Sequence, residues 1–306
     1  MTIWIQKPQV LHNIRIKTST PETSPHKTTC PDQPHISASQ LRTYAGCPLA
    51  WRLSRTYRPK HVSAALLFGS AFHAAAEKLY QSRLEGKTAT HQDLMDAYHA
   101  VWTNHFEATD GQEPVPIKYS AKSDLPALHQ TASRMLEAFL IHAAQNMGEV
   151  IAVEEPFEIE LVPDLPVLKG RIDLIEVRTG TSGNRYLHLS DFKTAARRMD
   201  EGDVDHDQMH LYAIAARKTG LLDQIGLPLV LRVDAVLKTK SAEVIPITIS
   251  PDKASETRVV AKAQQIWKSM SAGICFPATS WRCGDCGYRW LCAKWPDIEE
   301  TCNCSK

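Results

Sequence analysis

Hydrophobic and polar residues alternate in five stretches of the second half of the chain, as they do in β-strands. These stretches are residues 150–161, 167–177, 186–194, 229–237 and 243–249. The predicted helices cover residues 64–84, 92–107, 125–147, 205–219 and 251–271. A further helix begins near Ser37 or Ser39, because serine is a favoured N-terminal cap. The pattern therefore predicts an α/β fold whose first half is mainly helical.

The length and composition are those of a soluble globular protein. The 306 residues can form one large domain or two small ones, and 43% of them are hydrophobic while 23% are charged. No apolar run is long enough to span a bilayer, and no apolar leader follows Met1. We therefore predict a cytoplasmic protein with no membrane partner.

Two of the predicted strands carry acidic residues in otherwise apolar runs. Residues 167–177 and 186–194 are joined by a Gly/Ser/Asn turn, which predicts an antiparallel pair. Asp173 and Asp191 then lie close together on adjacent strands, and Lys193 shares the face of Asp191 because side chains repeat every two residues. Such a group can hold a hard metal ion and a water molecule. The alternative is two strand-end aspartates and a solvated lysine, although aspartate is disfavoured in strands.

Other polar residues are less specific by themselves. His73 lies on an apolar helix, where a buried structural histidine is the commoner case. Gln208 and Tyr212 are four residues apart and share one face of a predicted helix, either at a site or at its polar rim. Glu154 and Glu155 precede the aspartate pair, and alternation alone does not select which of them turns toward a metal.

The charge distribution is uneven although the net charge is only +1. No acidic residue occurs between Asp32 and Glu77, and basic residues are interleaved there with Trp51 and Tyr57. The basic residues include Arg52, Arg55 and Arg58, below called the arginine group. Such a segment suits contact with phosphates and bases. The alternative is the basic face of a solvated helix.

The chain has eight cysteines, and structural disulfides are rare in cytoplasmic proteins. Cys283, Cys286 and Cys292 form a C-x2-C-x5-C pattern, and Cys47 stands far upstream in a Gly-Cys-Pro context. Four thiolates can hold either a 4Fe–4S cluster or tetrahedral zinc. A zinc ribbon normally has two close cysteine pairs, whereas Cys47 is single.

Taken together, these motifs resemble a known family. Gly69-x-x-x-His73, Gly170-Arg-Ile-Asp173, Asp191-Phe-Lys193 and Gln208-x-x-x-Tyr212 occur in the order found in RecB-like nucleases of the PD-(D/E)XK superfamily. The cysteine triplet with its upstream partner is similar to the iron–sulfur branch, which includes the nuclease domain of AddB and the small nucleases of CRISPR adaptation. The resemblance covers about residues 37–295.

The resemblance implies a restriction-endonuclease-like core with a mixed central β-sheet and flanking helices. It implies a helical N-terminal layer and a C-terminal iron–sulfur segment. The expected divisions are a poorly ordered tail at 1–34, a single nuclease domain at 35–295 and a short tail at 296–306. Within the domain, residues 35–147 are mainly helical, 148–272 form the catalytic sheet with its helices, and 273–295 bind the cluster.

The resemblance also assigns roles to the site residues. Asp173, Asp191 and the carbonyl of Phe192 would hold Mg²⁺ or Mn²⁺ with His73 as a further ligand, and Lys193 would orient or activate the attacking water. Gln208 and Tyr212 would organise the site or bind the DNA strand. The resemblance favours a 4Fe–4S cluster over zinc, with the four ligands Cys47, Cys283, Cys286 and Cys292.

The function expected from the resemblance is metal-dependent hydrolysis of DNA phosphodiester bonds. We expect an exonuclease that acts on single strands or duplex ends in recombination, repair, phage replication or CRISPR adaptation. Recombination, helicase or CRISPR-adaptation proteins would be its partners. The alternatives are a non-catalytic module that binds DNA ends and a nuclease that acts on RNA.

Overall fold

The computed structural model describes residues 35–107, 113–121, 123–146 and 148–298. The tail predicted at residues 1–34 lies outside these ranges, as does most of the tail predicted at 296–306. Within the described ranges, no helix combines the length and apolar character needed to cross a bilayer.

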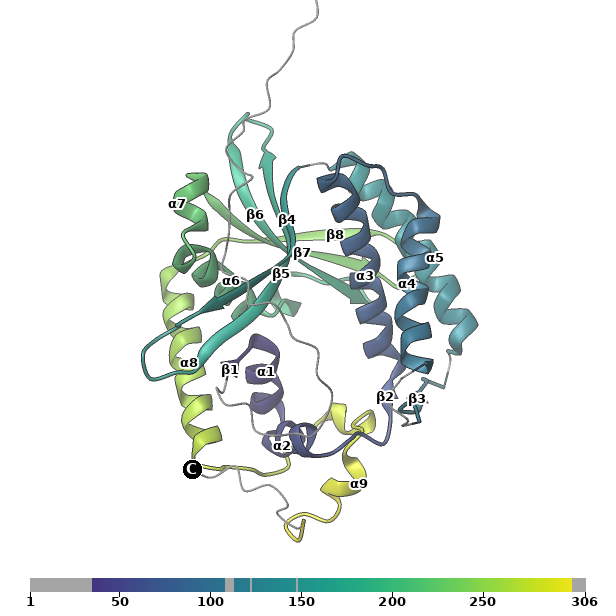
Figure 1. Ribbon diagram of the computed structural model, residues 1–306, viewed down its shortest axis with the longest axis vertical. Helices are drawn as coiled ribbons and strands as arrows, with labels where there is room; N and C mark the ends of the chain where they lie inside the picture. Colours follow the sequence, from purple (N-terminus) through teal and green to yellow (C-terminus); the bar gives the residue numbers. More distant parts are fainter. Residues whose placement is uncertain (1–34, 108–112, 122, 147, 299–306) are drawn as a thin grey trace, which may run out of the picture. The chain divides into compact units, whose positions relative to one another are not determined.

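A six-stranded mixed sheet forms the centre of the fold (Figure 1). In spatial order its long strands are β4 (Glu149–Ile159), β5 (Val167–Thr179), β6 (Arg185–Ala195), β7 (Leu229–Leu237) and β8 (Val244–Ile249). Strands β6 and β7 are parallel and the other neighbours among these five are antiparallel. The predicted mixed sheet is confirmed, and each long strand ends within two residues of its predicted bounds. The short strand β1 (His35–Ile36), which pairs in parallel with the start of β5, was not predicted.

Helices cover both faces of this sheet (Figure 1). On one face lie α3 (Ala64–Leu84), α4 (His91–Phe106) and α5 (Leu125–Gln145), and on the other lie α6 (His206–Lys218), α7 (Leu221–Ile225) and α8 (Lys253–Ser271). The short elements are α1 (Ala38–Gly46), α2 (Pro48–Thr56), β2 (Val62–Ser63), β3 (Ile117–Lys118) and α9 (Arg289–Cys292). The long predicted helices are confirmed, whereas α2, α7 and α9 were not predicted.

Helix starts follow from local capping chemistry. Of the two predicted caps, Ser37 is the one that caps α1, by accepting a hydrogen bond from the Gln40 N–H at 3.2 Å. Ser63 caps α3 in the same way. Cys47 ends α1 and caps α2, and Pro48 occupies the first position of α2, where its missing N–H costs nothing.

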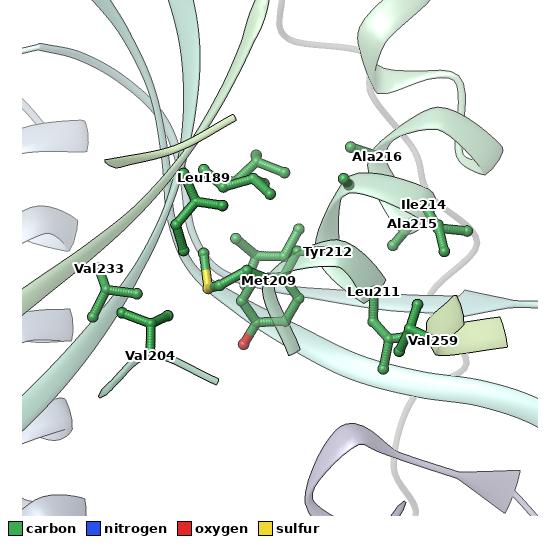
Figure 2. Close-up of a cluster of buried hydrophobic side chains, with 14 of the residues drawn as sticks. Leu189, Val204, Met209, Leu211, Tyr212, Ile214, Ala215, Ala216, Val233 and Val259 are labelled. Atoms are coloured by element: carbon green, nitrogen blue, oxygen red, sulfur yellow. The ribbon is translucent and has the colours of Figure 1, made fainter. Parts of the chain in front are cut away.

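Strand alternation builds a separate apolar layer on each face of the sheet. Leu189 of β6 and Val233 of β7 pack with Met209 and Tyr212 of α6 (Figure 2). Burying an aliphatic side chain of this size stabilises the fold by about 1.5–3 kcal/mol. On the opposite face, Phe192 stacks on Tyr80 of α3 at a ring distance of 5.6 Å. This stacking fixes the backbone of β6 between Asp191 and Lys193.

Residues 274–298, below called the cysteine segment, are held against α1, α2 and the chain that follows them. The Tyr44 hydroxyl donates to the Ile274 carbonyl at 2.6 Å, and the Leu49 N–H donates to the Phe276 carbonyl at 3.1 Å. The Lys60 N–H donates to the Gly287 carbonyl at 2.9 Å. A small core of Leu49, Leu53 and Leu291 lies beneath these bonds. The start and the end of the described chain are thereby joined.

Candidate active site

One wall of the site is a face of helix α3. Gly69, His73 and Glu77 are spaced by four residues and therefore share this face. They line a cavity of about 500 Å³ together with residues of β4, β5 and β6. Ala65 and Leu66, in the first turn of α3, also line it.

The opposite wall is the pair of strands β5 and β6. Leu174 pairs with Ser190, so that Asp173 and Asp191 occupy the neighbouring positions on the two strands. The backbone N–H of Phe192 donates to Asp173 Oδ2 at 2.8 Å. Both carboxylates are buried, and their expected juxtaposition is confirmed. Asp173, Phe192 and Lys193 all line the cavity.

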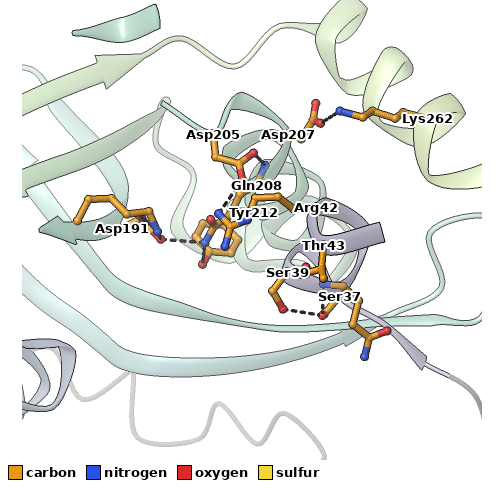
Figure 3. A network of polar contacts seen from close by, with 12 residues as sticks. Ser37, Ser39, Arg42, Thr43, Asp191, Asp205, Asp207, Gln208, Tyr212 and Lys262 are labelled. Carbon is orange, nitrogen blue, oxygen red and sulfur yellow. Dashed lines mark hydrogen bonds and ion pairs between the residues drawn. The ribbon is translucent and has the colours of Figure 1, made fainter. Parts of the chain in front are cut away.

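Asp191 contacts two donor side chains, and Figure 3 shows it beside Gln208 and Tyr212. Lys193 Nζ lies 3.0 Å from Asp191 Oδ1 and 2.7 Å from Oδ2. Gln208 Nε2 donates to Asp191 Oδ1 at 2.8 Å and to the Tyr212 hydroxyl at 2.8 Å. Helix α6 thus reaches the site through the face that Gln208 and Tyr212 share.

The structure brings His73 and Glu154 to the same carboxylate. His73 Nδ1 lies 3.2 Å from Asp173 Oδ2. One ligand atom each of His73, Glu154 and Asp173 lies within 4.8 Å of the other two. These three residues are below called the acidic cluster. Of the two glutamates that alternation could not separate, Glu154 is therefore the one that faces the site. It lies between the pairs Val153–Leu174 and Glu155–Ile172, which places it opposite Asp173.

Two features of the site were not found in the sequence. Glu77 lines the cavity one turn after His73, and the four-residue spacing between them was a usable signal. Glu154 has a φ of 50°, in the left-handed region that non-glycine residues rarely adopt. Nothing in the sequence indicated this backbone conformation.

The electrostatics of the site favour a bound cation. Burial, followed by the charges of Asp173 and Glu77, raises the pKa of Glu154 to about 7. Burial also raises the pKa of Asp191, against the opposing effect of Lys193. Burial works to lower the pKa of His73, but the hydrogen bond to Asp173 and the nearby carboxylate charges raise it overall. Crowded carboxylates with an imidazole nitrogen are a suitable ligand set for a divalent cation such as Mn²⁺ or Mg²⁺.

Of the four cysteines singled out in the sequence, Cys47 and Cys292 pack against the small core of the cysteine segment. The Cys47 sulfur accepts N–H bonds from Ala50 and Ala278, each at 3.4 Å. The pKa of Cys292 is raised by burial and then by the charges of Cys47, Cys286 and Cys283. The fold therefore brings Cys47 to the triplet although it lies 236 positions before Cys283 in the chain. None of the four forms a disulfide.

The arginine group lies on and just after α2. The Arg55 guanidinium lies 5.4 Å from the centre of the Trp51 ring, in cation–π contact. Arg58 donates a hydrogen bond to the Glu113 carbonyl. Arg52 is half-buried on α2. Helix α2 packs against the cysteine segment through Leu49, Leu53 and Leu291.

Comparisons with known proteins give one family match and two related sequences. A family model described as the PD-(D/E)XK nuclease superfamily matches residues 35–293. The Gene 69 protein of Mycobacterium phage D29 is 27% identical over 200 residues, which are 61% of this chain and 70% of that protein. An ATP-dependent helicase/deoxyribonuclease subunit of Symbiobacterium thermophilum is 27% identical over 208 residues, which are 60% of this chain and 18% of that relative.

Solved structures give a weaker likeness. A provisionally described exonuclease from Eubacterium rectale has a TM-score of 0.49 and 14% identity, and the alignment covers 88% of this chain and 90% of that chain. The structure of the protein SSO0001 has a TM-score of 0.32 and 15% identity, with 83% of this chain and 92% of that chain covered.

Proposed function

This chain belongs to the PD-(D/E)XK nuclease superfamily, and from this premise we propose that it is a divalent-cation-dependent deoxyribonuclease. Its proposed reaction is hydrolysis of phosphodiester bonds in single-stranded DNA or at duplex ends, as an exonuclease. The observation that carries the proposal is the convergence of His73, Asp173 and Lys193 on one cavity, with the buried Asp191 in direct contact with Lys193.

The proposed cation ligands are Asp173, Asp191, the Phe192 carbonyl and His73, and we add Glu154. The raised pKa values of Glu154 and Asp191 support this set, because they reflect negative charge that a cation would offset. A bound Mg²⁺ or Mn²⁺ supplies Lewis acidity toward a phosphoryl oxygen and lowers the pKa of a bound water.

The remaining residues of the site orient groups and offset negative charge. Lys193 is partly exposed to the cavity while its ammonium contacts Asp191, so it can orient a water and offset charge on the phosphate. Gln208 holds Asp191 in place through its amide, and Tyr212 in turn accepts from Gln208. We therefore assign both residues to organising the site rather than to cation binding.

We further propose that Cys47, Cys283, Cys286 and Cys292 hold a 4Fe–4S cluster, with zinc as the lesser alternative. The charges of Cys47, Cys286 and Cys283 contribute to the raised pKa of Cys292, which supports the proximity of the four thiols. A cluster at these residues would join the cysteine segment to α2.

The arginine group is the proposed backbone-binding element. Its guanidinium groups beside Trp51 can pair with phosphates while the indole contacts a base. The relationship to a helicase/deoxyribonuclease subunit supports a partner that unwinds or processes DNA.

End-labelled single-stranded DNA, duplex DNA and RNA of one sequence test the proposal. We expect cation-dependent cleavage of single-stranded DNA or of duplex ends, and none with EDTA. Asp191→Asn and Lys193→Ala should each lower cleavage by more than about a thousandfold, and the double variant should be no worse because both residues serve one water.

Glu155→Gln is the matched control, since Glu155 neighbours Glu154 without joining the acidic cluster. Binding of DNA without cleavage under any cation would replace the proposal by a non-catalytic DNA-end-binding module. Cleavage of RNA alone would make the protein a ribonuclease.

A further inference from the structure

Exposed aromatic side chains gather in the cysteine segment. Among the described residues, five of the nine exposed large hydrophobic side chains belong to it. They are Ile274, Phe276, Trp281, Trp290 and Trp295. Trp281 is 84% exposed. Exposed apolar side chains concentrated on one short segment can mark a binding surface.

The backbone that carries the tryptophans is held in place by hydrogen bonds and by a small apolar core. The main chain of the segment is hydrogen-bonded to Tyr44, Leu49 and Lys60. Leu291 anchors α9, between Trp290 and Cys292, in the small core with the leucines of α2. Exposure of the indoles is therefore built into an ordered segment, so they are available to a ligand without rearrangement.

Basic side chains lie close to two of these indole rings. The Arg282 guanidinium lies 5.4 Å from the centre of the Trp281 ring, and Lys294 Nζ lies 5.8 Å from that of Trp290. Of the two acidic residues in the segment, Asp285 is paired with Lys118 at 3.1 Å. The surface thus combines flat apolar faces with positive charge.

The cysteine segment contacts the chain that leads into α3, the helix that lines the cavity. Lys60 is bonded to Gly287, and the chain runs from Lys60 through β2 directly into α3. The first turn of α3 supplies Ala65 and Leu66 to the cavity lining. Figure 1 shows α9 beside α2, on the side of the molecule where β2 and β3 precede α3 and α5.

We propose that the tryptophans of the cysteine segment stack on unpaired bases of single-stranded DNA and lead the strand to the cavity. This inference rests on the proposed nuclease function and names its substrate class. Every base has a π-face that an indole can cover, and Arg282 and Lys294 can then meet the adjoining phosphates. The paired bases of a duplex are stacked on each other and do not offer these faces, so the surface selects single strands.

Binding measured without cleavage tests the proposal. The full-length, anaerobically purified protein is titrated in EDTA with a labelled oligothymidylate of about 20 nucleotides, enough to cover one binding site. An oligonucleotide of equal length with abasic sites keeps the phosphates but lacks the bases. Trp281→Ala and Trp290→Ala should each weaken oligothymidylate binding about 5- to 150-fold, and should leave abasic binding and the salt slope unchanged.

Two further variants separate stacking from other effects. Trp281→Phe retains an aromatic face and should recover most of the affinity. Phe106→Ala removes an exposed aromatic from α4, outside the surface, and should change nothing.

Equal losses on intact and abasic strands would overturn the stacking role, as would unchanged binding in both tryptophan variants. If those variants instead lose a protein partner, the surface is a protein interface. If the two tryptophan variants bind DNA as the wild type does and still cleave it, this inference is refuted and the proposed nuclease function stands. Tryptophan-dependent binding without cleavage under any cation refutes only the proposed nuclease function.

Discussion

Replacing Glu154 by glutamine should stabilise the cation-free protein even though it removes a residue of the proposed site. The Glu154 side chain is only 17% exposed, and Arg171 is a distant partner at 3.5 Å. Burial, with the charges of Asp173 and Glu77, raises the pKa of Glu154 from 4.5 to about 7. The ionised carboxylate therefore works against the fold when no cation is bound.

The sign and size follow from proton linkage. Between pH 4.5 and about 7 the folded protein keeps a proton on Glu154 that the unfolded chain has lost. The free energy of unfolding therefore falls as the pH rises through this window. A difference of about 2.5 in pKa corresponds to a ceiling of roughly 3 kcal/mol, and solvent contact reduces it to about 1–2 kcal/mol. Glutamine carries no charge, so Glu154→Gln should gain this amount at about pH 8 and nothing at about pH 4.

Urea denaturation in EDTA at both pH values measures the gain, and added Mn²⁺ tests its origin. The wild type should gain stability from Mn²⁺ by mass action, whereas Glu154→Gln should gain much less. Glu155→Gln should respond to Mn²⁺ as the wild type does, because Glu155 lies outside the acidic cluster. A Glu154→Gln variant no more stable than wild type in EDTA at the higher pH would refute the electrostatic reasoning. An undiminished Mn²⁺ response would refute the ligand assignment.

Three further results are expected. Cys47→Ser should bleach the brown anaerobic protein and lower its melting temperature, whereas Cys304→Ser should do neither; zinc without iron in the wild type would contradict the cluster. Gly287→Ala should destabilise the fold by about 1–3 kcal/mol in urea, because a Cβ there would lie 2.5 Å from the His61 carbonyl oxygen. Gly284→Ala meets nothing within 4 Å and should be neutral. Alanine at all three positions of the arginine group should weaken DNA binding and lower the salt slope by about 2, and an unchanged slope would assign the group to the solvated surface.

Most of the fold could be predicted because each long helix and strand has a recognisable pattern of hydrophobic residues. Strand β7 (Leu229–Leu237) was predicted end to end. The two residues of β1 have no periodicity, and their pairing with Val167 and Leu168 is decided by tertiary structure. Helix α2 was missed because a single extended residue, Cys47, separates it from α1.

Some residues of the two sites could be predicted from the local sequence, and others depend on long-range packing. Asp173, Asp191 and Lys193 lie on strands joined by a short turn, so alternation and pairing were enough to bring them together. Cys47 reaches its partners only through packing of α2 against the cysteine segment, and only the family resemblance connected them in advance. Glu77 could have been found, since the four-residue rule applied to Gln208 and Tyr212 also places it beside His73.

Glu154 shows why pattern reasoning fails where chemistry constrains the backbone. Alternation assigns side chains correctly only while the strand is regular, and β4 is irregular twice, at a register shift before Ala152 and at the φ of 50° of Glu154 itself. A non-glycine residue in this conformation costs about 1–3 kcal/mol. Both the backbone conformation of Glu154 and the burial of its charge opposite Asp173 therefore destabilise the fold. A residue that opposes stability in two independent ways is best explained by a requirement of function, and a divalent cation at this position would offset the second cost directly.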